Sequence, residues 1–191
     1  MADDRRSGSR PLSGPRHLIL TGLPGAGKTT VAELVAAELA AEWCDIDRRI
    51  EAATGRSVAE IFATQGEPAF RELERATMAT ALAEPPQIIA SGGGWAAQPG
   101  NLAAAELVAL TIYLQVTPEL AATRLGGAAD RPLLAGDPLP KLRALLAERE
   151  AWYSLAGLEV AADGPLELVA AGVVTAARQY GGWLRGGVGR S

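Results

Sequence analysis

The sequence predicts an α/β fold in which helices cover both faces of a parallel sheet. Short apolar runs alternate with longer segments of helical composition, at the spacing typical of strand–helix–strand units. One apolar run leads directly into a glycine-rich segment that opens a helix. The chain has 191 residues, of which 48% are hydrophobic, so one domain with a sizeable core is expected.

Composition excludes several classes of protein. Charged residues make up 21% of the chain, which argues against wholesale disorder, and no apolar run approaches the roughly 18 residues that span a bilayer. The single cysteine, Cys44, excludes an internal disulfide framework and a zinc site of several cysteines. A net charge of −4 gives no basic footprint for nucleic acid. We therefore expect a cytoplasmic protein with neither nucleic-acid nor membrane partners.

The two ends of the chain differ from its middle. Residues 1–15 are rich in Ser, Gly, Pro and Arg and lack an apolar segment like that of a secretory signal, so we expect a disordered leader. Residues 181–191 form a glycine-rich tail that is expected to fray, although Trp183 can dock. A single domain is expected over residues 16–180.

The first elements can be taken in order. His17–Thr21 is a short apolar run that predicts a buried parallel strand. Residues 28–41 have helical composition, and residues 43–44 form a brief second strand. Ser57 and Glu60 have the spacing of a capping box that opens a short helix. A longer helix is expected over residues 67–83, before two prolines.

The remaining elements follow the same alternation. Further strands are expected at residues 87–90, 107–116 and 158–161, and further helices at residues 141–155 and 165–180. Thr117 and Pro118 have the residue types of an N-cap and the first helical position. Residues 126–140, rich in glycine and proline, are expected to form a loop.

The strongest motif lies between the first strand and the first helix. Residues 22–29 match G-x-x-x-x-G-K-[ST], in which glycines let backbone N–H groups turn toward a phosphate, as does the positive end of the helix. Lys28 would reach the β- and γ-phosphates, and the Thr29 hydroxyl would ligate Mg²⁺. The alternative is a glycine-rich turn that binds nothing, but the position of the motif favours nucleotide binding. The residues expected to hold ATP here are Gly25, Ala26, Gly27, Lys28, Thr29 and Thr30.

Other features narrow the class of phosphate-loop protein. The chain has only two lysines, Lys28 and Lys141, and neither belongs to the Asn-Lys-x-Asp segment that reads guanine in GTPases. Residues 91–94 vaguely resemble the signature of transporter ATPases, but no apolar strand ends in the acid that those proteins use. The carboxylate that helps to hold Mg²⁺ must therefore come from elsewhere.

Asp45 and Asp47, just after the second strand, can supply that carboxylate. If the segment stays extended, both side chains point the same way, so one acid can hold metal-bound water and the other can orient a substrate hydroxyl. The alternative is structural, because an aspartate before residues 48–50 would also serve as a helix N-cap. Spacing alone leaves both interpretations open.

Taken together and in order, these motifs resemble those of the shikimate kinase family. Besides the phosphate loop and Asp45-x-Asp47, the resemblance rests on residues 55–62, Glu67-x-x-Phe70-Arg71-x-x-Glu74, Gly92-Gly93-Gly94, residues 131–134 and Arg149-x-x-x-Tyr153. It extends from about residue 17 to about residue 180. It implies a three-layer α/β/α fold with a five-stranded parallel sheet and a mobile lid at about residues 126–140. It also implies a monomer that transfers the γ-phosphoryl group of ATP to the 3-hydroxyl of shikimate with Mg²⁺.

The resemblance also implies roles for individual residues. Arg71 and Arg149 would bind the carboxylate of shikimate, and arginine suits this task because its planar fork pairs with both carboxylate oxygens. Asp47 would accept a hydrogen bond and the proton from the reacting hydroxyl, while Asp45 would hold Mg²⁺ through water. Arg124 and the lid residue Arg131 would reach the ATP phosphates, with Lys28, Asp47 and Arg131 as the catalytic set. The other residues expected to contact shikimate are Gly92, Gly93, Gly94, Val58, Phe62 and Phe70.

Several of these residues can instead have purely structural roles. Arg71 can be a surface arginine paired with Glu67 or Glu74 on its own helix, and Arg149 is similarly flanked by glutamates. Val58, Phe62 and Phe70 can be ordinary core residues, and Arg131 a solvated loop residue.

One departure from the family pattern is Trp95, which stands after the three glycines where the family has a small residue. It can pack outward or reshape the pocket for a different hydroxylated acid. The alternatives are thus a kinase of the same fold for a gluconate-like acid, or a related module that binds without turnover. A nucleoside monophosphate kinase would have no obvious use for the Asp-x-Asp and triple-glycine motifs.

Overall fold

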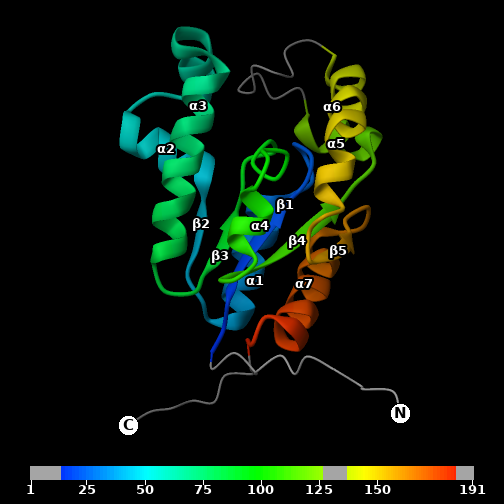
Figure 1. Cartoon of the computed structure of the whole chain (residues 1–191). Coiled ribbons are helices and arrows are strands. Elements are labelled where there is room, and N and C mark those ends of the chain that lie inside the picture. Colours follow the sequence, from blue (N-terminus) through cyan, green and yellow to red (C-terminus); the bar gives the residue numbers. More distant parts are fainter. Residues whose placement is uncertain (1–13, 127–136, 184–191) are drawn as a thin grey trace, which may run out of the picture.

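A computed structural model describes residues 14–126 and 137–183 (Figure 1). Its strands are β1 (His17–Thr21), β2 (Trp43–Asp45), β3 (Ile88–Ala90), β4 (Ala109–Gln115) and β5 (Leu158–Ala161). Its helices are α1 (Lys28–Leu39), α2 (Ile46–Thr54), α3 (Val58–Ala83), α4 (Asn101–Ala105), α5 (Pro118–Leu125), α6 (Pro138–Tyr153) and α7 (Leu166–Tyr180).

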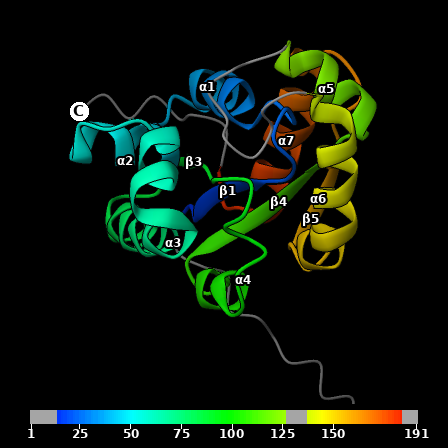
Figure 2. The same ribbon diagram turned by 90° about the horizontal axis from the view of Figure 1, so that it is seen from above.

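The five strands form one parallel sheet in the order β2-β3-β1-β4-β5, which confirms the predicted α/β class. Helices α1 and α7 lie together on one face, and α4 lies on the other face between α3 and α6 (Figure 2). The chain runs from the central strand β1 to the edge strand β2, returns through β3, passes over β1 to β4 and ends at β5. Because all pairings are parallel, the carboxyl ends of the strands meet at one edge. Ligands of open α/β sheets bind at this edge.

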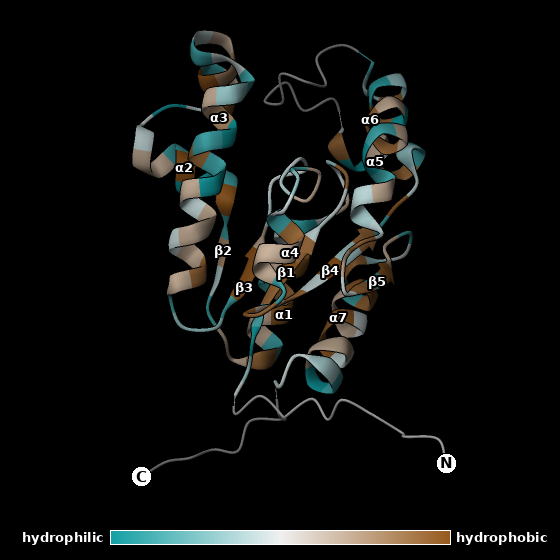
Figure 3. Cartoon of the chain, in the orientation of Figure 1, coloured by the Kyte–Doolittle hydropathy of each residue, from teal (hydrophilic) through white to brown (hydrophobic). Residues whose placement is uncertain are grey.

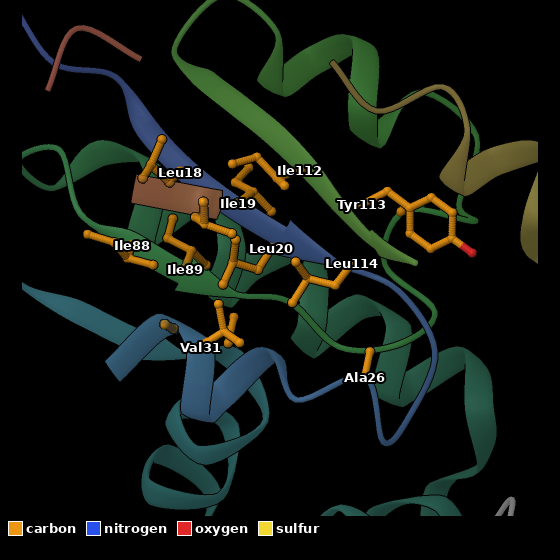
Figure 4. Packing of buried hydrophobic residues seen from close by; sticks show 14 of the residues in the cluster. Leu18, Ile19, Leu20, Ala26, Val31, Ile88, Ile89, Ile112, Tyr113 and Leu114 are labelled. Carbon is orange, nitrogen blue, oxygen red and sulfur yellow. The ribbon is translucent and has the colours of Figure 1, made fainter. Parts of the chain in front are cut away.

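The central strands are buried on both faces, as their continuous apolar sequences predict. Every residue of β1 and β3 is buried, whereas the edge strand β5 alternates between half-buried and exposed positions. Figure 4 shows Leu18 and Leu20 of β1, which the register places on the same face of the sheet as Ile88 of β3 and Ile112 of β4. The hydrophobic residues gather on the strands, and hydrophilic residues cover the outer helices (Figure 3).

Two helices differ from the predicted elements. The chain does not stay extended after β2, because α2 begins at Ile46 with Asp45 as its N-cap. Helix α3 joins the two predicted helices into one element, kinked where Gly66 has non-helical angles (φ 80°, ψ 172°). The capping box at Ser57 and Glu60 is present, with hydrogen bonds of 3.2 and 2.7 Å in its two directions.

The beginning and end of the described chain lie against each other. The amide of Arg16 donates to the carbonyl of Gly181 (2.9 Å), and the indole N–H of Trp183 donates to the carbonyl of Arg16 (2.8 Å). The Arg16 guanidinium also donates to the carbonyl of Tyr180 (3.0 Å), which ends α7. Trp183 therefore docks at the edge opposite the strand carboxyl ends. None of the helices in the described ranges is both long and apolar enough to cross a membrane.

Candidate active site

The predicted phosphate loop forms the turn between β1 and α1. Its glycines are required by space and by backbone angles: Gly25 has φ +84°, and a Cβ there would lie 2.5 Å from the Ala121 carbonyl oxygen. Gly27 (φ +87°) is the N-cap of α1, and no side chain among the described residues caps this end. The Lys28 ammonium folds back on the loop and donates to the carbonyls of Gly22 and Leu23, at 2.9 Å each.

Thr29, at the start of α1, lies next to Asp45, at the end of β2. The Thr29 hydroxyl donates to Asp45 Oδ2 (2.6 Å), and Asp45 Oδ1 accepts the backbone N–H of Arg48 (3.2 Å). The structural alternative, a helix N-cap, is therefore correct for Asp45, but it leaves the other carboxylate oxygen directed at the phosphate loop. Two adjacent oxygen donors fit Mg²⁺, which takes few protein ligands and completes its shell with water and substrate phosphates. Residues 14–126 and 137–183 contain no cluster of three His, Cys, Asp or Glu that could hold a metal ion.

A cavity of about 280 Å³ lies over the phosphate loop. It is lined by that loop, by the ends of β2 and β3, by Arg124 and Leu125 of α5, and by Leu166 at the start of α7. One guanidinium nitrogen of Arg124 donates to the Gly164 carbonyl (2.7 Å), which holds this side chain at the rim. The predicted residues that line the cavity are Gly25, Gly27, Lys28, Thr29, Thr30, Asp45, Asp47, Gly93 and Arg124. Ala26 is fully buried beneath them.

Asp47, in the first turn of α2, borders the cavity next to a second carboxyl group, Glu74 of α3. Both lie against Gly92: a Cβ there would collide with Glu74 Oε1 and lie 3.2 Å from Asp47 Oδ1. Glu74 is only 1% exposed, and burial raises the pKa of its carboxyl group despite the opposing pull of Arg71, with the charge of Asp47 adding to the rise. Sequence reasoning placed Glu74 in a motif but gave it no place in the site.

Arg71 is buried and paired within its own helix. Its guanidinium donates to Glu74 (2.8 Å) and to Glu67 (2.8 and 3.1 Å), and the ring of Phe70 lies 5.4 Å from its central carbon. Burial alone would lower the pKa of Arg71, but the two carboxylates raise it above its ordinary value. The expected pairing with Glu67 and Glu74 is thus present, but Arg71 is 9% exposed and is no surface arginine.

The three glycines after β3 each lie close to a different part of the chain. A Cβ on Gly93 would lie 3.2 Å from Pro24 of the phosphate loop, and one on Gly94 would overlap the Arg71 guanidinium, 2.6 Å from its central carbon. Gly92, as described above, lies over the two carboxyl groups. The glycine turn therefore touches the phosphate loop, the Asp47–Glu74 pair and Arg71 at successive residues.

The other side of the turn faces α6. Arg149, 7% exposed, donates from Nη1 to the Gly93 carbonyl (3.2 Å), and the hydroxyl of the buried Tyr153 donates to the same oxygen. Arg149 and Tyr153 are four residues apart and share one helix face. That spacing could have identified Tyr153 from the sequence, but it was not read as part of the site.

The remaining predicted residues differ in burial, and some lie outside the described residues. Phe62 and Phe70 pack with ring centroids 4.7 Å apart across the kink of α3; Phe70 is buried, while Phe62 and Val58 are half-buried. Arg131 and most of the predicted lid lie outside the described residues. Trp95 is 2% exposed, belongs to the hydrophobic core and does not line the cavity over the phosphate loop.

Comparisons with known proteins agree with this geometry. A family model described as shikimate kinase matches residues 24–174. A shikimate kinase of Caldanaerobacter subterraneus subsp. tengcongensis is 39% identical over 163 residues, which cover 84% of this chain and 95% of that protein. A shikimate kinase of Thermobifida fusca is 45% identical over 154 residues, covering 80% of this chain and 86% of the relative.

The fold of this chain is also similar to that of solved structures. A shikimate kinase of Acinetobacter baumannii in complex with shikimate superposes with a TM-score of 0.81 and 31% identity, covering 85% of this chain and 92% of that one. A gluconokinase of Sinorhizobium meliloti reaches a TM-score of 0.58 at 13% identity, with 87% and 94% of the two chains covered. This second likeness extends to the fold alone.

Proposed function

This chain belongs to the shikimate kinase family and is an ATP-dependent kinase, and we propose how its residues divide the reaction between them. The reaction transfers the γ-phosphoryl group of ATP to the 3-hydroxyl of shikimate and yields shikimate 3-phosphate and ADP. A transfer of this kind needs little covalent chemistry from the protein. It needs the two substrates to be held in line and the negative charge to be neutralised.

One observation carries the assignment of the acceptor end. Two buried arginines, Arg71 and Arg149, meet successive residues of one glycine turn, and that turn packs on Pro24 of the phosphate loop. A cationic pair fixed this close to a phosphate-binding loop suits an anionic acceptor that must lie next to the γ-phosphate. We assign the shikimate carboxylate to these two guanidinium groups.

The partners of Arg71 suggest how that carboxylate is exchanged. Glu74 is buried and stays with the guanidinium, whereas Glu67 is half exposed at 49% and can turn away to solvent. An incoming carboxylate then replaces Glu67 on Nε and Nη2, which is the bidentate geometry that arginine offers. Phe62, Phe70 and Val58 supply the apolar wall, and the N–H groups of the turn at residues 92–94 face the substrate oxygens.

Asp47 is the proposed acceptor of the proton from the reacting hydroxyl. It borders the cavity between the phosphate loop and the glycine turn, within reach of both proposed substrates. A carboxylate there orients the hydroxyl oxygen toward the phosphorus and takes its proton as the new P–O bond forms. No covalent enzyme intermediate is needed.

The nucleotide end rests on the phosphate loop. We assign residues 25–30 and Arg124 to the ATP phosphates, with Lys28 moving from the loop carbonyls to the β- and γ-oxygens. Thr29 and Asp45 would hold Mg²⁺, which neutralises phosphate charge when it is bound. Arg131 belongs in this proposal as a further phosphate contact from a lid between α5 and α6. The predicted lid boundary at residue 140 is too late, because α6 begins at Pro138.

Further proposals concern the context of the enzyme. We propose that the enzyme acts as a monomer, as the family resemblance implies. Cys44 is buried and free, which fits the reducing cytoplasm in which ATP is available. The domain proposed over residues 16–180 contains the whole site.

The test is an ADP-release assay with MgATP and, side by side, shikimate, gluconate, quinate and nucleoside monophosphates. We expect turnover with shikimate and a loss of at least about 100-fold in kcat for Asp47→Asn, since general-base groups contribute roughly 10²–10⁴-fold. Because Trp95 is a core residue, we expect no preference for another acid. Turnover of gluconate but not shikimate would contradict the proposal.

A further inference from the structure

The carbonyl oxygen of Gly93 receives two hydrogen bonds from α6, one from Arg149 Nη1 (3.2 Å) and one from the hydroxyl of Tyr153. The arginine is already assigned to the substrate carboxylate. The tyrosine is 0% exposed, so it does not touch a substrate in this conformation. Its hydroxyl donates to the glycine turn and also interacts with the Arg149 side chain.

The surroundings of Tyr153 keep that hydroxyl in place as a donor. Its ring stacks on Tyr113 of β4, with centroids 5.1 Å apart and planes inclined by 28°. Burial raises the pKa of Tyr153 to about 12, so the group remains protonated at any pH at which a kinase works. A buried hydroxyl is costly without a partner, and the Gly93 carbonyl is the partner provided.

Fixing this carbonyl also fixes a donor on the opposite side of the peptide. Peptide bonds are planar, and none among the described residues is cis, so the N–H of Gly94 points away from the Gly93 carbonyl. With the carbonyl held toward α6, the Gly94 N–H is directed away from that helix. The Cα of Gly94 lies against the Arg71 guanidinium, and that of Gly93 lies against Pro24.

We propose that Tyr153 is a positioning residue for shikimate: its hydroxyl locks the Gly93–Gly94 peptide so that the Gly94 N–H faces the acceptor and the Arg149 guanidinium stays beside the turn. The proposal rests on the proposed function of this site and goes beyond it by adding a residue that acts without touching the substrate. Packing alone does not explain the residue, since phenylalanine would fill the same space and keep the stack on Tyr113.

The decisive variant is Tyr153→Phe, and its matched control is Tyr113→Phe, which removes a hydroxyl from the same stacked pair without a bond to Gly93. We expect Tyr153→Phe to raise KM for shikimate about 3- to 10-fold, the equivalent of one hydrogen bond, with KM for ATP and kcat within about twofold of wild type. Tyr113→Phe should leave all three constants within about twofold. A purely structural role would instead lower kcat and disturb both KM values together.

A double-mutant cycle gives an independent readout. Tyr153 and Arg149 share one acceptor, so the losses in shikimate affinity caused by Tyr153→Phe and Arg149→Lys should not add in the double variant. Simple additivity would overturn the proposed coupling. Unchanged KM for shikimate in Tyr153→Phe would overturn the proposal itself.

The outcomes separate this inference from the function on which it rests. Failure of the wild-type enzyme to phosphorylate shikimate contradicts the proposed function, whereas wild-type activity with an unaltered Tyr153→Phe contradicts only the inference. If Tyr153→Phe does not fold, the amide signal of Gly94 in the ¹H–¹⁵N spectrum of the wild-type protein provides the test. It should shift when shikimate is added, and a signal that does not move would contradict the assigned direction of this N–H.

Discussion

At the scale of single residues, Arg71 shows how one side chain can be structural and functional at once. It is held by Glu74 beneath it and by the more exposed Glu67 beside it, and its guanidinium covers Gly94. The buried carboxylate fixes the direction of the fork in the absence of substrate. The enzyme thus meets the substrate with its cation already oriented.

Replacing Arg71 by lysine keeps the positive charge but removes the planar fork. We expect Arg71→Lys to raise KM for shikimate roughly 10- to 100-fold, because charge-assisted hydrogen bonds contribute about 1.5–3 kcal/mol. The control is Arg75→Lys on the same helix, where the arginine pairs with Glu72 at the surface. Steady-state kinetics of the two variants distinguish them, and equal effects would argue against a specific carboxylate site at Arg71.

The sequence alone identified the part of the site whose residues are neighbours in the chain. The phosphate loop could be predicted because all of its parts lie within eight consecutive residues. The reasons for Gly92, Gly93 and Gly94 could not, because Glu74, Pro24 and Arg71 come from other segments of the chain. Capping a helix and serving the phosphate site are alternatives for Asp45 in the sequence. In the structure, one carboxylate oxygen caps α2 and the other faces the phosphate loop.

At the scale of elements, α3 carries the acceptor side of the site. Its first part bears Val58 and Phe62, and its second part bears Phe70 and Arg71, with the kink at Gly66 between them. The capping box at Ser57 fixes where the first part begins. The cap therefore lies at the start of the segment that carries the apolar wall.

Removing the cap should lower stability in a defined way. We expect Ser57→Ala to decrease the free energy of unfolding by about 1 kcal/mol, because the N–H of Glu60 loses its acceptor. Ser57→Asp, which retains an oxygen acceptor, should lose much less. Urea unfolding of the three proteins measures both effects, and equal stability of Ser57→Ala and wild type would contradict the prediction.

A glycine in the middle of α7 offers a test in the opposite direction. Gly172 is helical, and a Cβ there would meet only Val160 Cγ1 at 3.4 Å, an ordinary contact. We expect Gly172→Ala to raise the free energy of unfolding by about 0.5–1 kcal/mol, chiefly through the entropy of the unfolded chain. Ala171→Gly, at the exposed neighbouring position, should lower it by a similar amount in the same urea titration.

Most elements could be predicted from periodicity and turn residues, and the exceptions have physical reasons. Helix α2 was predicted only as the alternative in which Asp45 is an N-cap, because two acids two residues apart also fit an extended segment. The glycine at its C-cap, Gly55 at φ +65°, marks where the helix ends. Helix α4 has only five residues, too few to show a period. Strand β4 is two residues shorter at its start than predicted, because Leu107 and Val108 are exposed in the preceding turn.

At the scale of the whole molecule, the order of the strands was the part that local patterns could not provide. Pairing of β1 with both β3 and β4 joins segments about 70 and 90 residues apart in the chain. The family resemblance predicted a five-stranded parallel sheet, which the structure confirms, and the order of the strands comes from the structure. Its consequence is that β1 places the phosphate loop at the centre of the site and β3 places the glycine turn beside it.

The single histidine makes the stability of the molecule depend on pH in a predictable way. Burial lowers the pKa of His17 below its ordinary value, against hydrogen bonding to the backbone of Leu82 and the charge of Glu84. The unfolded chain therefore takes up a proton near pH 6.5 while the folded protein does not. Stability should fall as the pH drops below about 6.5, by at most about 1.4 kcal/mol per pH unit, until the folded histidine also titrates.

His17→Asn, which keeps an acceptor for the Gln87 N–H, should lack this loss when unfolding is measured between about pH 7 and pH 5. Because His17 is the only histidine in the chain, its imidazole proton signal reports the folded pKa directly. A folded pKa at or above 6.5 would contradict the prediction.

The contact between Arg16 and residues 181 and 183 makes the described fold nearly a closed ring. A short peptide could join these two ends, and the chain could then be opened elsewhere, for example before α4. Such a circularly permuted enzyme would keep every pairing of the sheet while exchanging the order in which its halves leave the ribosome. Fusion partners or surface attachments placed at this seam would likewise lie at the pole remote from the substrates, which makes the seam the natural anchoring point for immobilised enzyme.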